Sequence, residues 1–167
     1  MAGPHAAMNF RRFEPAQLPE LASWFPDAEQ LRTWGGPDSR FPFTPEMFRE
    51  DSKVDSIDSW SLVDDGGGLA AFGQCYLRVG RCHFGRIAVS PGQRGRGLGT
   101  RLIREMADWG QKQFGERELS LFVIKTNEDA RRLYRRLGFR EVPYPDAAFM
   151  PDAYYMVASH LPPHTDQ

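Results

Sequence analysis

The sequence predicts one α/β domain built on a mixed, mostly antiparallel β-sheet with helices on both faces. The chain has 167 residues, of which 41% are hydrophobic and 13% aromatic, enough to form a single core. Short apolar runs typical of strands occur first beside short helical segments. Further along the chain they occur in consecutive pairs typical of hairpins. Strands alternate with longer amphipathic segments only in the second half. This order favours a mixed sheet over a purely parallel one.

The first 60 residues predict a strand followed by short helices. Met8–Phe13 is the strand, and apolar residues then recur at helical spacing from Leu18 to Phe25. A second short helix is expected over Asp27–Trp34, because Gly35–Pro37 would stop it. An irregular stretch rich in Pro and Phe follows through Phe43.

Two hairpins are expected in the middle of the chain. Trp60–Val63 and Leu69–Leu77 have strand character, and the segment Asp64–Gly68 between them contains three glycines that tolerate the positive φ of a tight turn. The next hairpin turns near Gly80, and Arg81–Val89 is its return strand.

Helical signals dominate after residue 97. Leu98, Leu102, Met106 and Trp109 lie on one face of a predicted helix. The short apolar run Leu119–Ile124 is typical of a buried strand.

The end of the chain predicts one more helix and two strands. Thr126–Asp129 has the composition of a helix start, and Gly138 suits a helix end. Phe139–Val142 and Tyr154–Ala158 are the last expected strands.

These elements are assigned to a single domain over residues 8–160. Residues 1–7 are expected to be a disordered or non-native leader, and residues 161–167 a loose tail. No apolar stretch approaches the ~18 residues that a membrane helix needs, and no signal or transit peptide is evident. The sequence therefore predicts a soluble, cytoplasmic protein.

The two cysteines, Cys75 and Cys82, are expected to be small buried apolar residues. No second pair of metal-spaced ligands accompanies them, so no metal site is predicted. They flank a turn and could face each other across two strands, but a cytosolic location disfavours a disulfide.

Charge is distributed unevenly along the chain, although the net charge is −1. Residues 1–65 contain 6 Lys/Arg and 12 Asp/Glu, whereas residues 66–140 contain 15 and 6. The basic half suits an anionic partner and the acidic half a cationic one, although solvated surface explains most such charges.

The most informative segment is the glycine-rich run Gln93–Thr100 between the strand Arg81–Val89 and a helix. Glycines at such a junction let backbone N–H groups point into one concavity beside a helix N-terminus, which predicts a phosphate cradle. Gly97 and Gly99 could instead serve only a tight turn. The spacing does not fit a dinucleotide fingerprint, and no Walker Lys-Ser/Thr pair follows.

Two motifs about 30 residues apart resemble the GNAT superfamily of N-acetyltransferases. Ile87–Pro91 followed by Arg94–Gly99 matches the family's R/Q-x-x-G-x-G/A segment after a strand that ends in valine. Downstream, the pattern N-x-x-A-x-x-x-Y-x-x-x-G-F is reproduced by Asn127, Ala130, Tyr134, Leu137, Gly138 and Phe139. The resemblance covers Phe84–Val142 well and is topological elsewhere, so a GNAT-like sheet is expected.

The resemblance implies acetyl-CoA as the co-substrate. The strand backbone would pair with the two amides of pantetheine, residues 94–99 would cradle the pyrophosphate, and Asn127 would contact the arm as well as cap its helix. The cofactor-binding residues implied in this way are Ile87, Ala88, Val89, Arg94, Gly95, Arg96, Gly97, Leu98, Gly99, Thr100, Asn127, Ala130 and Tyr134.

Three catalytic roles are assigned on the same basis. The Val89 N–H would polarise the thioester carbonyl, and Tyr134 would protonate the departing thiolate, unless it only packs. His83 occupies the strand position where many family members carry a glutamate, so it would be the base, unless it is structural. A water chain that ends at an N-terminal acid is the other candidate, with the acids Glu46, Glu50, Asp51 and Asp55.

The expected activity is acetyl transfer from acetyl-CoA to a primary amine of a small molecule or a protein. The same N-terminal acids could line an amine pocket together with core aromatics, namely Trp24, Trp34, Phe41, Phe43 and Trp60. The alternative is a non-catalytic module that binds acyl-CoA. Nucleic acid is not an expected partner, because no groove-reading or interleaved aromatic motif occurs. A membrane is not expected either, because no apolar stretch is long enough to span one. The acceptor, the acyl-chain preference and the choice between monomer and homodimer stay open.

Overall fold

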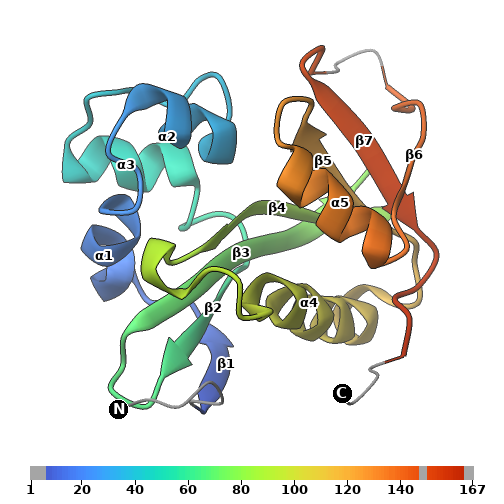
Figure 1. Ribbon diagram of the computed structural model, residues 1–167, viewed down its shortest axis with the longest axis horizontal. Helices are drawn as coiled ribbons and strands as arrows, with labels where there is room; N and C mark the ends of the chain where they lie inside the picture. The colour runs from blue at the N-terminus through green and yellow to red at the C-terminus, as the bar shows by residue number, and fades with distance from the viewer. Residues whose placement is uncertain (1–6, 147–149, 164–167) are drawn as a thin grey trace.

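Seven strands form one sheet in the computed structural model, which describes residues 7–146 and 150–163 (Figure 1). The strand order is β1-β2-β3-β4-β5-β7-β6, with β4 and β5 parallel and every other neighbouring pair antiparallel. The mixed, mostly antiparallel sheet is therefore confirmed. The strands are β1 (Met8–Arg12), β2 (Ser59–Asp64), β3 (Leu69–Arg78), β4 (Arg81–Val89), β5 (Leu119–Ile124), β6 (Arg140–Glu141) and β7 (Ala153–Ala158).

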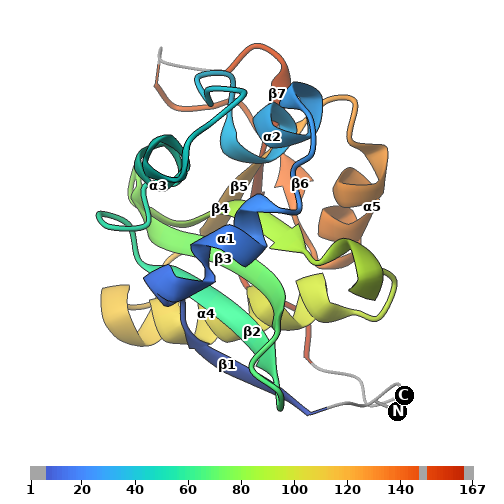
Figure 2. The same cartoon turned by 90° about the vertical axis from the view of Figure 1, so that its left-hand side faces the viewer.

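Helices cover both faces of the sheet, as predicted (Figure 2). The helices are α1 (Leu18–Ala22), α2 (Ala28–Gly35), α3 (Pro45–Ser52), α4 (Leu98–Phe114) and α5 (Glu128–Arg136). Adjacent residues of β2 divide between the two faces: Leu62 packs with α4, while Val63 packs with α1–α3. This division follows from the alternation of side chains along a strand.

The predicted face of α4 is largely buried. Leu98, Leu102 and Met106 lie in the core, and Trp109 packs at its edge with its ring centroid 4.9 Å from that of Trp60. Trp60 therefore belongs to the α4 side of the sheet. The other aromatics considered for an amine pocket pack on the opposite side, and they are Trp24, Trp34, Phe41 and Phe43.

Helix α3 was not expected from the sequence, although its start signal is present. The Thr44 side chain accepts a hydrogen bond from the Met47 N–H (3.2 Å), and Pro45 occupies the first turn. This is the ordinary chemistry of a helix N-terminus. The other elements begin and end within a few residues of their predicted bounds.

Cys75 and Cys82 are buried and unbridged, as predicted, with their sulfurs 3.2 Å apart beneath Gly110 of α4. The sequence predicted a leader at residues 1–7 and a loose tail at residues 161–167, but residues 1–6 and 164–167 lie outside the described residues. Within residues 161–163, Leu161 packs against the core, and the Pro162 carbonyl accepts a hydrogen bond from Arg104 (2.6 Å). Among the described residues, no helix is both long and apolar enough to cross a membrane.

Candidate active site

The site begins at a bulge in β4. Phe72 of β3 pairs with Ala88 and Gln74 pairs with Gly85, so two residues of β4, Arg86 and Ile87, lie opposite a single residue of β3. Arg86 has a φ of +48°, which is uncommon for a residue with a side chain. A bulge bends its strand and increases the local twist.

Beyond the bulge, β4 separates from its parallel neighbour. Pairing between β4 and β5 covers Cys82–Phe84 and Leu119–Leu121 only, so the last part of β4 presents an edge that β5 does not occupy (Figure 1). The Ser90 N–H donates to Ala70 on the β3 side (2.8 Å). Since backbone groups alternate along a strand, the preceding Val89 N–H points to the open edge.

Trp34 of α2 holds the bulge from the other side. Its indole Nε1 donates to the carbonyl of Arg86 (2.6 Å), and its ring stacks on Phe25 (centroids 4.3 Å apart) and Phe48 (5.8 Å). This contact fixes the N-terminal helices against the strand that carries the site.

The glycine-rich run leads from β4 into the N-terminus of α4. Gly95 and Gly97 have φ values of +79° and +75°, which glycine adopts without strain. A Cβ built on either would meet no other group within 4 Å, so both backbones border open space. Gly99 lies in the first turn of α4, and its Cβ would contact Leu133 and Val89 at 3.7 Å. This geometry suits the predicted phosphate cradle.

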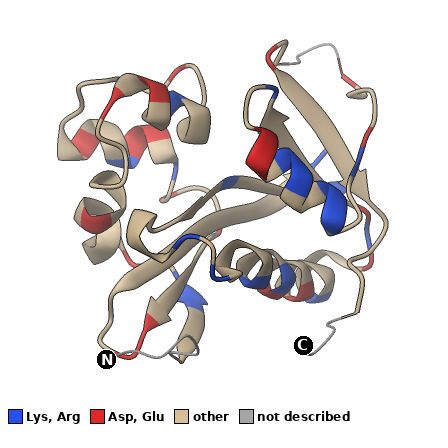
Figure 3. Cartoon of the chain, viewed as in Figure 1, with Lys and Arg blue, Asp and Glu red and all other residues tan. Residues whose placement is uncertain are grey.

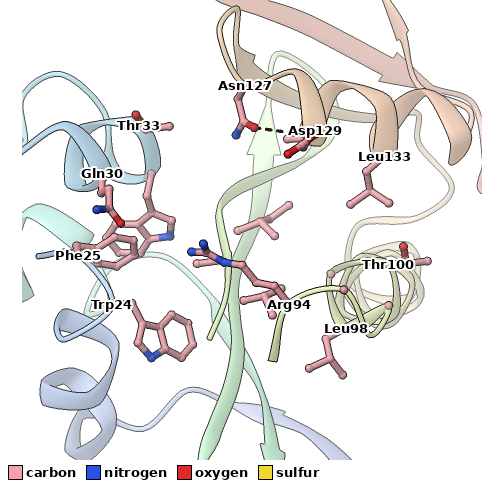
Figure 4. Close-up of a pocket in the computed structure, with 18 of the residues that line it drawn as sticks. Trp24, Phe25, Gln30, Thr33, Arg94, Leu98, Thr100, Asn127, Asp129 and Leu133 are labelled. Carbon is pink, nitrogen blue, oxygen red and sulfur yellow. Dashed lines mark hydrogen bonds between the residues drawn. The ribbon is translucent and has the colours of Figure 1, made fainter. Parts of the chain in front are cut away.

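A cleft of about 860 Å³ runs along this loop and the open edge of β4 (Figure 4). Eleven of the thirteen cofactor-binding residues expected from the sequence line it, namely Ile87, Ala88, Val89, Arg94, Gly95, Gly97, Leu98, Gly99, Thr100, Asn127 and Ala130. Arg96 and Tyr134 do not line this cleft, and Arg96 is exposed on the loop.

Part of the cleft wall lies outside the set of cofactor-binding residues expected from the sequence, although Trp24 was considered for an amine pocket. Residues from the N-terminal segment form the side opposite the loop, and α5 adds three more. These residues are Trp24, Phe25, Glu29, Gln30, Thr33, Asp129, Leu133 and Arg136. Figure 4 shows Arg94 between the two walls. The loop and α5 contribute Arg94, Arg136 and Asp129 to the cleft, and the opposite wall contributes Glu29. Figure 3 shows further acidic residues on α1–α3, across from the loop and α5.

Asn127 caps α5, as the sequence predicted. Its Oδ1 accepts a hydrogen bond from the Ala130 N–H (3.3 Å), the dashed line of Figure 4. The helix ends before Gly138, whose φ is +98°. The cap places Asn127 where it lines the cleft and also a second cavity.

The second cavity, of about 220 Å³, adjoins the cleft at the bulge. The two share the residues Thr33, Trp34, Ile87, Asn127 and Ala130. Tyr134 and His83, the two side chains given catalytic roles, both line this smaller cavity together with Tyr76, Arg78 and Arg86. The structure thus brings the proposed acid and base into one compartment next to the open edge of β4.

Tyr134 is 8% exposed, and burial raises its pKa to about 12. The phenol therefore stays protonated at neutral pH. Its ring packs against Phe139 (centroids 6.1 Å apart). The hydroxyl, which keeps its proton, is the candidate donor.

His83 is 2% exposed, and its Nδ1 lies 2.9 Å from the Ser120 hydroxyl. Its ring packs edge-on against Tyr76 and Phe122. Burial, with a smaller effect from the Arg78 charge, lowers its pKa to about 3. The imidazole is therefore neutral across the physiological range, and its role as the base stays a prediction.

The buried His83 has a measurable consequence for stability. Its pKa is about 3 when folded and about 6.5 when unfolded, so below pH 6.5 the unfolded chain binds a proton that the folded chain does not. We expect the free energy of unfolding to be highest above pH 6.5 and to fall by about 1.4 kcal/mol per pH unit towards pH 4.5. Urea unfolding at several pH values measures this slope. A His83→Gln variant should lose it, and an unchanged slope in that variant would contradict the assignment.

The acids considered as the end of a water chain lie on or after α3, away from both cavities. Arg40 binds Glu50 and Asp51 (2.8 and 2.9 Å), and Arg49 binds Asp55 (2.7 Å). Neither these three acids nor Glu46 lines the cleft or the smaller cavity. In the described part of the chain, no cluster of three or more His, Cys, Asp or Glu could hold a metal ion.

Comparisons with known proteins agree with this geometry. The model of the acetyltransferase (GNAT) family matches residues 21–139. A mycothiol acetyltransferase from Beutenbergia cavernae is 32% identical over 145 residues, covering 73% of this chain and 48% of that protein. The chain spans less than half the length of the curated relatives it matches.

Solved structures share the fold over nearly the whole chain. A GCN5-related N-acetyltransferase from Kribbella flavida has a TM-score of 0.69 at 25% identity, covering 93% of this chain and 98% of that one. The PaiA N-acetyltransferase of Thermoplasma acidophilum, solved with coenzyme A, has a TM-score of 0.66 at 16% identity, covering 91% and 98%. Together with the family match, the bulged β4, the glycine-rich loop and the capped α5 show that this chain belongs to the GNAT family of acetyltransferases.

Proposed function

We propose that this chain is an N-acetyltransferase that transfers the acetyl group of acetyl-CoA directly to a primary amine. The observation that carries the proposal is the junction of two cavities at the open edge of β4. The long cleft has the size and the loop for a nucleotide with a pantetheine arm, and the smaller cavity suits an acceptor. The likeness to acetyltransferases, one of them solved with coenzyme A, supports this assignment.

The residues of the cleft fit acetyl-CoA. The loop backbone at Gly95 and Gly97 and the N-terminus of α4 offer N–H groups to the pyrophosphate, and Arg94 and Arg136 add positive charge. The edge of β4 that β5 leaves open pairs with the amides of the pantetheine arm as a further strand would. Asn127 contacts the arm from α5.

The transfer needs two positioned donors. The amine nitrogen attacks the thioester carbon while the Val89 N–H, which points to the open edge, donates to the carbonyl oxygen as its charge grows. The carbon–sulfur bond then breaks, and the Tyr134 hydroxyl gives its proton to the sulfur. The products are an N-acetylated amine and coenzyme A.

His83 is proposed as the group that takes the amine proton. Its low pKa means that it cannot keep this proton at neutral pH. The proton must therefore pass on within the same turnover, and the Tyr134 phenolate, whose conjugate acid has a pKa of about 12, is a far stronger acceptor. When kcat/KM is expressed per concentration of unprotonated amine, His83 as the base places the acidic limb of the enzyme's own pH profile far below neutrality.

The proposal is tested by an amine panel with acetyl-CoA and longer acyl-CoAs, in which released thiol is followed with a thiol reagent. We expect amine-dependent release of coenzyme A and an acetylated product by mass spectrometry. Reactions without amine measure simple hydrolysis. Binding of acetyl-CoA without amine-dependent thiol release would instead support the alternative, a non-catalytic acyl-CoA-binding module.

The remaining partners are also proposals. The acceptor is a small-molecule or protein amine, and neither nucleic acid nor membrane takes part. Light scattering coupled to gel filtration distinguishes a monomer from a homodimer.

A further inference from the structure

The smaller cavity has an unusual charge for a compartment that receives an amine. Two arginines, Arg78 and Arg86, line it, and none of its described lining residues is Asp or Glu. An amine that enters as an ammonium ion would therefore meet like charge with no carboxylate to offset it.

Arg86 is held in place by a buried polar network. Its Nη1 donates to Gln74 Oε1 (2.9 Å), and the fully buried Gln74 donates in turn to the Ser52 carbonyl (2.7 Å) and the Ser59 hydroxyl (3.1 Å). The bulge fixes its backbone, and Trp34 binds its carbonyl. The guanidinium is therefore pre-organised at the cavity.

One N–H of this guanidinium lacks a partner. Arg86 Nε is buried and makes no hydrogen bond with any described residue. Buried charged donors without an acceptor are rare and costly. Asp51 is the acid that acts on Arg86 electrostatically, but its carboxylate accepts hydrogen bonds from Arg40. The guanidinium thus carries one donor without an acceptor among the described residues.

Arg78 is the second cation. Its Nε donates to the Tyr144 hydroxyl (2.9 Å), and its guanidinium lies over the Phe122 ring (5.1 Å to the centroid). In the described part of the chain, neither Arg78 nor Arg86 takes part in a salt bridge. Within the described residues, no carboxylate therefore forms an ion pair with either arginine of the cavity.

We infer that the acceptor is a small primary amine that also carries a carboxylate, which Arg86 and Arg78 bind. This inference rests on the proposed function and names its substrate class. Guanidinium groups bind carboxylates through charge-assisted hydrogen bonds. The two charges also lower the pKa of the bound ammonium, which favours the neutral amine that the reaction needs. Polycationic amines are disfavoured for the same reason, and the volume of about 220 Å³ favours a small acceptor.

The test compares amines that differ only in the carboxylate, such as phenylalanine with phenethylamine and alanine with ethylamine, alongside spermidine and kanamycin. Because a carboxylate also changes amine basicity, kcat/KM is expressed per concentration of unprotonated amine. We expect at least a tenfold preference for the carboxylate member of each pair. Spermidine and kanamycin should react more slowly than either amino acid.

Variants connect the preference to the arginines. Arg86→Gln and Arg78→Gln should each reduce the ratio of kcat/KM between paired substrates at least fivefold, and Arg86→Lys should retain part of it. Arg49→Gln removes an equal charge from the exposed ion pair on α3, and it should leave the ratio unchanged. If Arg86→Gln does not fold, the Arg78→Gln variant tests the inference instead. Arg78 is only half-buried, so its replacement should leave the fold intact.

The outcomes separate this inference from the proposed function. Equal rates within each pair, or faster reaction with spermidine or kanamycin, would overturn the inference while the acetyltransferase assignment stands. No amine-dependent thiol release with any amine would overturn the proposed function and, with it, the inference.

Discussion

Replacing Tyr134 by phenylalanine is expected to lower turnover ten- to a thousandfold with little change in acetyl-CoA affinity. Asn127 and Tyr134 are seven residues apart on α5, nearly two turns, so Tyr134 lies about 10 Å further along the helix. In the structure Asn127 lines both cavities, whereas Tyr134 lines only the smaller one. The group removed by this substitution is the proposed proton donor.

Tyr134 carries its proton at neutral pH, as a proton donor must, because burial raises its pKa to about 12. The same desolvation raises the pKa of a thiol beside it, so the departing thiolate also becomes a better proton acceptor than it is in water.

The measurement is steady-state kinetics with a thermal melt on the same preparation. Tyr154→Phe is a matched control, because Tyr154 lines neither the cleft nor the smaller cavity. Wild-type turnover in a folded Tyr134→Phe protein would show that water protonates the thiolate.

Replacing Gly97 by valine is expected to weaken coenzyme A binding at least tenfold, about 1.4 kcal/mol. At a φ of +75° a β-branched residue is strained, so the loop must shift and its N–H groups lose their common direction. Because the added side chain would face open space, the fold itself should survive.

Calorimetry with coenzyme A measures the loss. Gly92→Val in the same segment is the control, since Gly92 has no positive φ and its Cβ would also meet nothing within 4 Å. Gly99→Val tests the cradle without that strain, because its Cβ would meet Leu133 and Val89 at ordinary contact distance. Unchanged affinity in a folded Gly97→Val protein would remove the cofactor assignment.

Most of the fold could be predicted because its signals are local. The hairpin between β3 and β4 turns at Gly80, which has a φ of +79°, and Asn127 and Gly138 mark the limits of α5. Helix α3 was missed although Thr44 and Pro45 signal its start, because the surrounding Pro and Phe residues suggested an irregular segment.

The residues of the candidate site were likewise predictable only where their sequence signal is local. The residues of the glycine-rich loop and the cap of α5 were identified because each motif is continuous in sequence. Phe25 and Thr33 on the opposite wall were not, because only the packing of α2 on β4 through the Trp34–Arg86 contact brings them to the cleft.

The sequence by itself determined the strand–loop–helix of the proposed cradle, the capped helix that carries Tyr134, and the family to which both motifs belong. Only the tertiary structure decided the electrostatics of the smaller cavity. The low pKa of His83 arises from burial, and the unpaired Arg86 Nε arises from a bulge and a partner 12 residues away. Desolvation and charge balance depend on groups distant in sequence, so no local pattern records them.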